Sequence, residues 1–425
     1  MTDIECATCE PARGISRRTV LRGMAIGAAV AGVSSALGPF GTRVAWAATP
    51  GYTGDTLVIL SLRGGFDAMS AIVPAADPDY YRLRPSIAIP AARTLPIDSR
   101  FGLHPALAPL TPLIDAGHLG FVHAVGLPAP NRSHFDAMDE LEQAAPGSAL
   151  RTGWLDRMLA LHDPDGPFGA VQMGSSTMPY SLAGSFPALG MDSLDRFSLH
   201  AAWDAASTTG WSNALTALHT GAGAALKESA TGTLGALATT AALASAANAP
   251  TVTYPDTNLG HALSDAGRLI RGNKGARVIT IDEGDWDMHS GMGTVDGGWM
   301  VDHLTDLAAC LAAFAADLGS RIANVTLLTI TEFGRRASEN ESQGLDHGWG
   351  SAMMLLGGGV VPGVHGSWPG LSDAALNDGD LAVTTDYRAV LADVLTKRCG
   401  ASTSEVASVL PGFTGATLGV TRARA

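Results

Sequence analysis

The stretch that decides the fold is Thr56–Leu62, which reads TLVILSL and is followed at once by Arg63-Gly64-Gly65. A short, nearly continuous apolar run that ends in a glycine pair predicts a buried strand closed by a turn. Because the run is apolar throughout and does not alternate with polar residues, it is typical of a parallel sheet that helices cover on both faces.

Further segments repeat this pattern along the chain. Short apolar runs predict strands at Leu119–Val125, Phe168–Met173, Val278–Ile281, Val325–Ile330 and Ala352–Leu356. Helical spacing predicts helices over Pro105–Ala116, Ser133–Gln143, Val301–Leu318 and Thr385–Lys397. Strands that alternate with helices predict an α/β domain with a largely parallel sheet. Between about residues 205 and 250 the composition shifts to Ala, Thr, Gly and Ser, which predicts a helical insertion.

The first residues have the pattern of an export signal. Arg17-Arg18 follows Ser16, a mildly apolar run extends over Gly23–Leu37, and Ala45-Trp46-Ala47 resembles a cleavage site. Together these features predict a twin-arginine signal over residues 1–47 and a mature domain over residues 48–425. The alternative is a basic pair that precedes a core helix. We therefore expect a periplasmic or secreted protein whose first partner is the twin-arginine export machinery.

The net charge excludes some classes of binding partner, and the cysteines divide between the predicted signal and the mature chain. The formal net charge of −13 argues against nucleic acid and anionic membranes. After the signal we expect no integral membrane span, because the nearest candidate, Leu234–Ala247, is rich in Ala, Thr and Ser. Cys6 and Cys9 belong to the predicted signal, whereas Cys310 and Cys399 remain in the mature chain as a possible disulfide or as buried free thiols.

The segment after Val278–Ile281 is the main candidate for a metal site. It reads Asp282-Glu283-Gly284-Asp285-Trp286-Asp287-Met288-His289, and carboxylates and imidazoles are the ligands that zinc and similar ions take. We expect Asp285 and His289 to bind one divalent ion, most simply zinc, together with His347 from a later loop. The alternatives are a solvated acidic loop and histidines that only form local hydrogen bonds.

Three further residues at predicted strand ends are candidate catalytic groups, since ligands bind at the carboxyl ends of parallel strands. Arg63 can clamp an anion, or it can form an ion pair with Asp67 or Asp282. Ser133 can act as a nucleophile, although a helix cap is the commoner role of a serine there. Glu332 is the third candidate, and its alternative is a salt bridge with Arg335 or Arg336. The chain contains no G-x-S-x-G elbow and no G-x-x-x-x-G-K-[ST] phosphate loop.

Several motifs taken together resemble one bacterial family. They are LVILSLRGGFDAMSAIVP at Leu57–Pro74, FGLHP at Phe101–Pro105, RSHF at Arg132–Phe135, GWL at Gly153–Leu155, TEFGR at Thr331–Arg335, DHG at Asp346–Gly348, LGGGV at Leu356–Val360, WPGL at Trp368–Leu371 and TTDYR at Thr384–Arg388. Over nearly the whole mature chain they resemble the family catalogued as domain of unknown function 1501, whose members typically carry twin-arginine signals. That family looks like a distant branch of the alkaline phosphatase and sulfatase superfamily.

The resemblance implies a three-layer α/β/α sandwich with metal ions at the strand ends. Asp285 and His289 match the superfamily's Asp-x-x-x-His ligands, His347 matches its late histidine, and Ser133 or Asn131 falls near the nucleophile position. Two positions depart from the pattern: Arg63 stands where the superfamily has a metal-binding aspartate, and Glu332-Phe333 replaces an Asp-His pair. One metal site is therefore expected.

The expected function is that of an exported metal-dependent hydrolase acting on phosphate or sulfate esters, with an unidentified anionic ester as substrate. The rival interpretation is a non-catalytic binding or assembly protein on a degenerate phosphatase-like scaffold. A fold by itself does not decide between the two.

Overall fold

The computed structural model describes residues 55–161, 168–198 and 205–424. The predicted export signal, with Arg17-Arg18, Cys6 and Cys9, lies outside the described residues. The predicted strand Thr56–Leu62 is β1, and all of its residues are buried.

A central sheet organises the described residues. Its strand order is β11-β5-β10-β9-β1-β8-β6-β7, and β12 pairs with β5 at one end. The strands are β1 (Thr56–Leu62), β5 (Leu119–Gly126), β6 (Ala170–Met173), β7 (Leu189–Met191), β8 (Val278–Glu283), β9 (Val325–Ile330), β10 (Ser351–Gly357), β11 (Gly363–His365) and β12 (Thr385–Asp386).

Strand direction decides which loops meet. β1 is parallel to β8 and to β9, with Leu60 opposite Ile281 on one side and Thr329 on the other. β10 is antiparallel to both β5 and β9, so β5 runs in the same direction as β9. The carboxyl ends of β1, β5, β8 and β9 therefore share one edge of the sheet, and the amino end of β10 lies there too. We call this the carboxyl edge.

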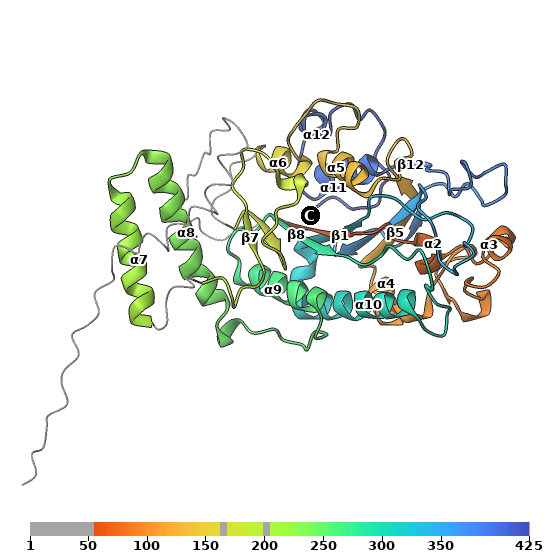
Figure 1. Cartoon of the computed structure of the whole chain (residues 1–425), viewed down its shortest axis with the longest axis horizontal. Coiled ribbons are helices and arrows are strands. Elements are labelled where there is room, and N and C mark those ends of the chain that lie inside the picture. The colour runs from red at the N-terminus through yellow and green to blue at the C-terminus, as the bar shows by residue number, and fades with distance from the viewer. Residues whose placement is uncertain (1–54, 162–167, 199–204, 425) are drawn as a thin grey trace, which may run out of the picture.

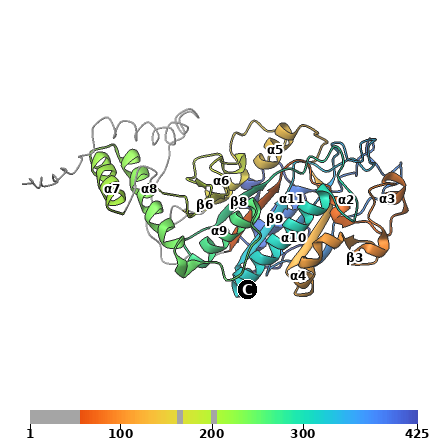
Figure 2. The same cartoon turned by 60° about the horizontal axis from the view of Figure 1, so that its bottom comes forward.

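Helices cover both faces of the sheet (Figures 1 and 2). Val58 and Leu60 of β1 belong to the core on the face of α9 and α10, whereas Leu57 and Ile59 belong to the core on the face of α5, α6, α11 and α12. This alternation is the two-residue period of a strand. The helices are α4 (Thr111–Asp115), α5 (His134–Gln143), α6 (Trp154–Leu159), α9 (Asn258–Gly272), α10 (Trp299–Leu318), α11 (Tyr387–Lys397) and α12 (Thr403–Val409). The predicted three-layer α/β class is thus confirmed.

A helical hairpin projects from one end of the body, at the left of Figure 1. It consists of α7 (Ala205–Thr220) and α8 (Ala224–Leu243), within the Ala- and Thr-rich segment that the sequence predicts to be helical. Leu243 and Ala236 of α8 are buried in the main core. The hairpin is therefore attached to the body through the second half of α8.

Shorter elements complete the described chain. A small sheet has the order β2-β4-β3, and the helical turns fill the connections. These elements are α2 (Ala68–Ala71), β2 (Ile72–Val73), α3 (Pro78–Leu83), η1 (Ala91–Arg93), β3 (Leu95–Pro96), β4 (Gly102–Leu103), η2 (Pro105–Leu110), η3 (Tyr180–Leu182), η4 (Ala246–Asn248) and η5 (Gly319–Asn324). The predicted helix Pro105–Ala116 is divided between η2 and α4, where Pro109 and Pro112 interrupt the α-helical hydrogen bonds.

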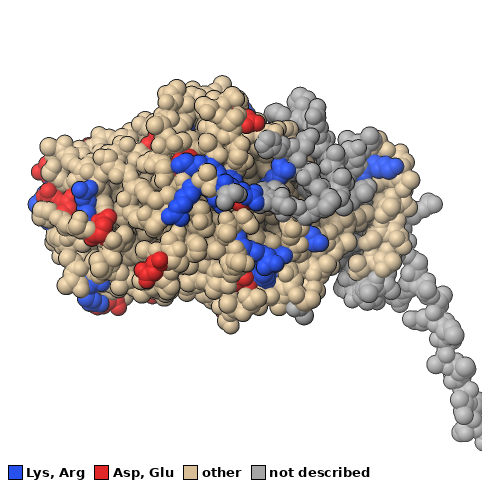
Figure 3. Space-filling view, turned by 180° about the vertical axis from the view of Figure 1, so that it is seen from behind, with Lys and Arg blue, Asp and Glu red and all other residues tan. Residues whose placement is uncertain are grey.

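The described residues also include a long apolar helix, two cysteines and a largely uncharged face. Among the described helices, α10 with η5 is long and apolar enough to cross a membrane by length and composition, but Leu307, Leu311 and Phe314 pack it onto the sheet. Cys310 and Cys399 are free thiols in the structure. Viewed from behind, most of the surface is neither acidic nor basic (Figure 3), in keeping with 16% charged residues.

Candidate metal centre

Three loops bring a compact group of metal-ligating side chains to the carboxyl edge. His134 begins α5 after β5, Asp287 follows β8, and His347 precedes β10. One donor atom from each of these residues lies within 4.8 Å of the other two. We call His134, Asp287, His347 and the adjoining His289 the histidine centre.

The ring nitrogens of the histidine centre face the carboxylate of Asp287. His347 Nε2 lies 3.1 Å from Asp287 Oδ1, and His289 Nε2 lies 3.1 Å from the same oxygen. His134 Nε2 lies 3.5 Å from the other oxygen, Oδ2. The two Nε2 atoms of His289 and His347 are 2.9 Å apart. The side chains remain 22–44% exposed, so the centre is open to solvent on one side.

Each histidine of the centre is held through its other ring nitrogen. His134 Nδ1 lies 2.7 Å from Glu332 Oε1, and His289 Nδ1 lies 2.9 Å from Asp346 Oδ1. His347 Nδ1 lies 2.9 Å from the backbone carbonyl oxygen of Arg132. Carboxylate and carbonyl oxygens accept hydrogen bonds, so each Nδ1 carries the proton and donates it. This is the arrangement in which outer groups orient metal-bound histidines.

A cation fits the converging nitrogens. When each Nδ1 carries the proton of a neutral ring, each Nε2 presents a lone pair. The lone pairs of His289 and His347 then face each other across 2.9 Å, and they repel unless a proton or a cation lies between them. His134 Nε2 is buried and has no hydrogen-bond partner among the described residues. Three imidazole nitrogens and one carboxylate form a donor set that suits zinc and its neighbours in the first transition row.

The charge of Asp287 is secured by an arginine. Burial by itself would raise the pKa of Asp287, but the hydrogen bond from the Arg335 guanidinium and the contact with His347 outweigh it and hold that pKa below its ordinary value. Arg335 Nη2 lies 2.6 Å from Asp287 Oδ1, and the arginine is almost fully buried. Burial is the main cause that lowers the pKa of His347, and the contact of its ring with the Asp287 carboxylate opposes this shift. Both groups are therefore in the ionisation state that binds metal near neutral pH.

Local geometry explains how the loops approach so closely. Ser133 is the N-cap of α5, with its side chain accepting from the backbone N–H of Asp136, so His134 is the first helical residue and extends over the carboxyl edge. Gly64 has a φ of +116°, and a Cβ atom there would lie 2.7 Å from the backbone nitrogen of Asp287. Only glycine tolerates this contact, which places the turn after β1 against the Asp287 loop.

The structure brings together two of the three predicted metal ligands. His289 and His347 both lie in the histidine centre, but Asp285 does not. Asp285 has a φ of +68°, and its carboxylate lies 3.6 Å from His303 Nε2 on α10. The left-handed turn at Asp285 thus directs Asp285 away and lets Asp287, two residues later, face the histidines. The structure therefore places Asp287, and not the predicted Asp285, beside His289 and His347.

Arg63 is neutralised by carboxylates and is not an open anion clamp. Its Nε lies 2.7 Å from Asp282 Oδ1 and its Nη2 lies 2.8 Å from Glu142 Oε1. Burial alone would lower the pKa of Arg63, but these two carboxylates raise it. The ion pair with Asp282 is the alternative that the sequence had left open. Glu142 is at the far end of α5 from His134, so Arg63 ties that end of the helix to the sheet.

Glu332 and Ser133 have structural partners. Besides His134, Glu332 Oε1 accepts from the backbone N–H of Gly64 at 2.8 Å, and the glutamate is 3% exposed. Glu332 therefore positions His134, and it forms no salt bridge with Arg335 or Arg336 among the described contacts. Ser133 Oγ lies 3.4 Å from the backbone nitrogen of Asp136, which is the helix-cap role.

Sequence reasoning missed His134 and Asp287. His134 lies inside the quoted RSHF motif, in which only Ser133 was taken as a candidate catalytic residue. Asp287 lies inside the quoted acidic loop, where the Asp-x-x-x-His spacing favoured Asp285. The useful signal was the histidine immediately after a predicted N-cap, because the first residue of a helix that follows a parallel strand lies near the carboxyl edge.

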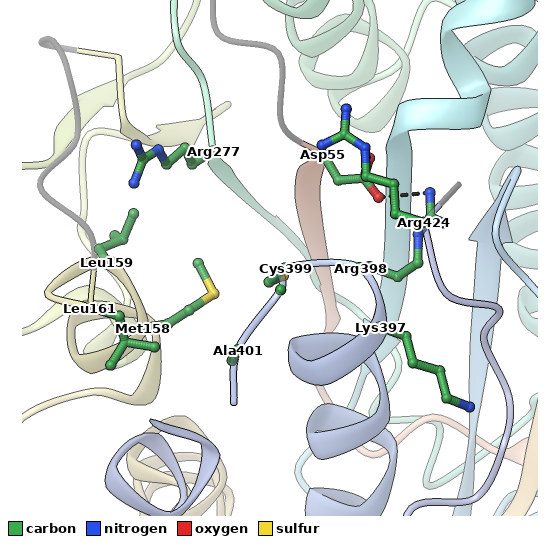
Figure 4. A pocket seen from close by; sticks show the side chains of 11 residues that line it. Asp55, Met158, Leu159, Leu161, Arg277, Lys397, Arg398, Cys399, Ala401 and Arg424 are labelled. Atoms are coloured by element: carbon green, nitrogen blue, oxygen red, sulfur yellow. Dashed lines mark ion pairs between the residues drawn. The ribbon is translucent and has the colours of Figure 1, made fainter. Parts of the chain in front are cut away.

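A cavity of about 280 Å³ lies at the opposite edge of the sheet. Asp55, which precedes β1, and Arg277, which precedes β8, line it. Figure 4 shows Asp55 with Arg398 and Arg424 on one side, and Met158, Leu159 and Leu161 on the other. Arg398 Nη2 lies 2.7 Å from Asp55 Oδ2. Because strands separate this cavity from the histidine centre, it does not serve as the mouth of that centre.

Comparisons with known proteins match a family but no characterised relative. The model of the family described as "Protein of unknown function (DUF1501)" matches residues 119–396. No curated protein matches the sequence. A solved protein of the alkaline phosphatase superfamily from Vibrio parahaemolyticus is 11% identical with a TM-score of 0.30, and the match covers 73% of this chain and 62% of that one.

An alkaline phosphatase from the Antarctic bacterium TAB5 is also similar to this chain. It is 10% identical with a TM-score of 0.27, and the match covers 73% of this chain and 95% of that one. At TM-scores this low, neither structure says anything about the activity of this chain. A proposal about activity therefore rests on the geometry of the histidine centre.

Proposed function

The chain belongs to the family described as protein of unknown function DUF1501, and we propose that it is an exported metal-dependent hydrolase of the phosphate or sulfate ester class. The observation that carries this proposal is the convergence of the Nε2 atoms of three histidines on Asp287, with every Nδ1 beside an oxygen acceptor. We propose one divalent ion, zinc, held by His134, Asp287 and His347, with His289 adjoining.

Bound zinc would supply a Lewis acid for the ester oxygen and lower the pKa of a coordinated water. Glu332 and Asp346 keep the rings of His134 and His289 in orientation, and Arg335 keeps Asp287 ionised. The open side of the centre leaves room for an ester, as catalytic zinc sites require. Since Ser133 caps α5, we propose water as the nucleophile and not the serine hydroxyl.

The first experiment measures metal and then turnover. Protein purified with zinc should contain about one ion per chain, and both His134→Ala and His347→Ala should lose it. Asp285→Ala is the matched control and should retain the ion, because Asp285 faces His303. Metal content that is unaffected by His134→Ala and His347→Ala would refute the centre.

Turnover is then measured on 4-nitrophenyl phosphate and 4-nitrophenyl sulfate. We expect hydrolysis of at least one ester, lost in His347→Ala and retained in Ser133→Ala. A Ser133→Ala protein that keeps its zinc and its fold but loses all activity would restore the serine as nucleophile.

A second candidate function has one observation in its favour. Arg63 is paired with Asp282 and Glu142, so its charge is not available to an anionic substrate in the way the sequence suggested. A metal-binding protein without catalytic activity would need no such charge. Bound zinc with no turnover of either ester class would favour this non-catalytic role.

The export part of the proposal rests on the sequence alone. Replacement of Arg17-Arg18 by two lysines should leave the precursor in the cytoplasm, whereas the unchanged protein should be found in the periplasm or the medium. Cell fractionation and immunoblotting measure the difference. Unchanged export of the double-lysine variant would argue against the twin-arginine route.

A further inference from the structure

Phe135 is an apolar side chain left in solvent beside the histidine centre. It is 86% exposed, whereas the other exposed large apolar side chains of the described residues, Leu150, Met178 and Leu218, are 37–48% exposed. Single exposed apolar residues are common on protein surfaces and need no explanation by themselves. Phe135 differs from the other three because it is next to His134 of the histidine centre.

Phe135 directly follows His134, and both residues lie in the first turn of α5. Consecutive Cα atoms are about 3.8 Å apart, so Phe135 begins one residue away from a ring that faces Asp287. The inward side of α5 is already filled, because Ala137, Met138 and Leu141 are buried in the core. Phe135 lies in the first turn, at the end of α5 that extends over the carboxyl edge.

The charges around Phe135 restrict what can rest on it. Asp136 is its neighbour in sequence and Asp139 lies one helical turn further on the same surface. Neither side chain forms an ion pair with a described residue, and both are exposed. Asp346, which holds His289 of the centre, is 56% exposed. A second negative charge on a bound molecule would be repelled here.

We propose that Phe135 binds the organic part of the substrate, and that this part is aromatic or otherwise apolar and carries no negative charge. The proposal rests on the function proposed above, and it names the class of ester that the centre takes. The anionic head of the ester would lie at the histidine centre and its apolar part would pack against the Phe135 ring. Phe135 is thus a specificity-determining residue, separate from the candidate ligands.

The test measures binding, with phosphonates that cannot be hydrolysed at the carbon–phosphorus bond. Titration calorimetry on the zinc-loaded protein compares phenylphosphonate, methylphosphonate and 4-carboxyphenylphosphonate. We expect phenylphosphonate to bind roughly tenfold more tightly than methylphosphonate, the size of one aromatic contact. The carboxylated compound should lose most of this advantage, since the exposed carboxylates Asp136, Asp139 and Asp346 would repel its added negative charge.

Three variants assign the effect to the ring. Phe135→Ala should bind phenylphosphonate and methylphosphonate equally, with unchanged zinc content, and Phe135→Tyr should keep the preference. Leu218→Ala removes an exposed apolar side chain on the distant hairpin and should behave as wild type.

The outcomes separate this inference from the proposed function. Equal affinities for the two phosphonates in the wild type, or a preference that survives Phe135→Ala, would overturn the role of Phe135 and leave the hydrolase proposal standing. Loss of zinc in Phe135→Ala would also overturn it, because the residue would then support the centre itself. Failure of the wild type to bind methylphosphonate would overturn the hydrolase proposal, and this inference with it.

Discussion

At the scale of single residues, the centre depends on groups that do not touch the proposed ion. Glu332, Asp346 and the carbonyl of Arg132 each fix one imidazole by accepting from its Nδ1. Glu332 is the most buried of the two carboxylates, and it also accepts from Gly64 and Thr331. It is therefore the residue whose replacement should reveal the effect of orientation alone.

We expect Glu332→Gln to weaken zinc binding by roughly 10- to 100-fold, the usual effect of losing such an outer partner. The physical reason is that the neutral amide holds the Nδ1–H of His134 less strongly and in a less defined orientation. Competition with a fluorescent chelator measures the change. Glu341→Gln, at an exposed position, is the control, and equal zinc affinity in the two variants would contradict the assigned role.

Two buried histidines away from the centre predict how stability depends on pH. Burial lowers the pKa of His104 to about 4, and burial also lowers the pKa of His123 to about 4. In the unfolded chain both titrate near 6.5. Between pH 6.5 and 4 the unfolded chain therefore binds more protons, so the free energy of unfolding should fall as the pH falls through this window.

Each histidine should contribute a loss on the order of 3 kcal/mol by pH 4. His104→Asn keeps an acceptor for the backbone N–H of Ala106 but does not titrate, so it should reduce the pH slope by about one proton. Urea unfolding at several pH values gives the slope. His261→Gln, which replaces an exposed histidine, should leave it unchanged, and an unaltered slope in His104→Asn would contradict the assignment.

Two members of the histidine centre could be predicted from the sequence and two could not. His289 and His347 were predicted because each lies in a recognisable motif, the acidic loop after β8 and Asp346-His347-Gly348. His134 and Asp287 were missed because their selection depends on backbone direction, namely the capped start of α5 and the positive φ of Asp285. A spacing rule does not detect a left-handed turn at a non-glycine residue, so it favoured Asp285, whereas the structure places Asp287 beside the histidines.

At the scale of elements, α5 is fastened to the sheet at both ends. His134 bonds to Glu332 after β9, and Glu142 bonds to Arg63 after β1. Burial raises the pKa of Glu142 in spite of Arg63, which shows how strongly this carboxylate depends on its partner. The helix that carries His134 is thus held by two carboxylate bonds as well as by its apolar face.

We expect Arg63→Met to lower the free energy of unfolding by roughly 1–3 kcal/mol, because it leaves Glu142 buried without its cation. The double variant Arg63→Met with Glu142→Met should recover part of the loss, since two apolar side chains replace the pair. Urea denaturation measures both. If Arg63→Met kept full stability but lost affinity for phosphate, Arg63 would be the anion clamp that the sequence had suggested.

Most of the sheet could be predicted from short apolar runs, and β1 and β9 match their predicted limits. The helix α9 was not predicted, although Leu259, Leu263 and Ala266 are buried on one side of it. Its apolar residues recur at helical spacing, so the sequence contains a signal for this helix. The antiparallel direction of β10 was also not predicted, because an apolar run has no polarity; direction is set by the pairing with β5 and β9.

At the scale of the whole molecule, the histidine centre exists only in the folded chain. Its members come from the start of α5, from the loop after β8 and from the loop before β10, so unfolding separates them completely. A cation that binds the centre therefore stabilises the native state by mass action. At about one hundred times its dissociation constant, the gain is about 2.7 kcal/mol.

We expect zinc removal with a chelator to lower the melting temperature by several degrees, and zinc addition to restore it. The double variant His134→Ala with His347→Ala should melt at one temperature with or without zinc. Differential scanning fluorimetry measures these shifts. A chelator effect of equal size in wild type and double variant would place the stabilising ion elsewhere.

The antiparallel direction of β10 shortens the connection that leads into it and keeps that connection at the carboxyl edge. Parallel neighbours need a crossover to the other edge of the sheet, but an antiparallel pair can be joined without leaving its edge. The connection from β9 to β10 uses this freedom, and it carries Glu332, Arg335, Asp346 and His347. Its exposed tip accepts hydrogen bonds at Ser342 and Gln343 from the backbone N–H groups of Gly291 and Met292, so a change in this loop would shift the segment after His289 while the strands below keep their register.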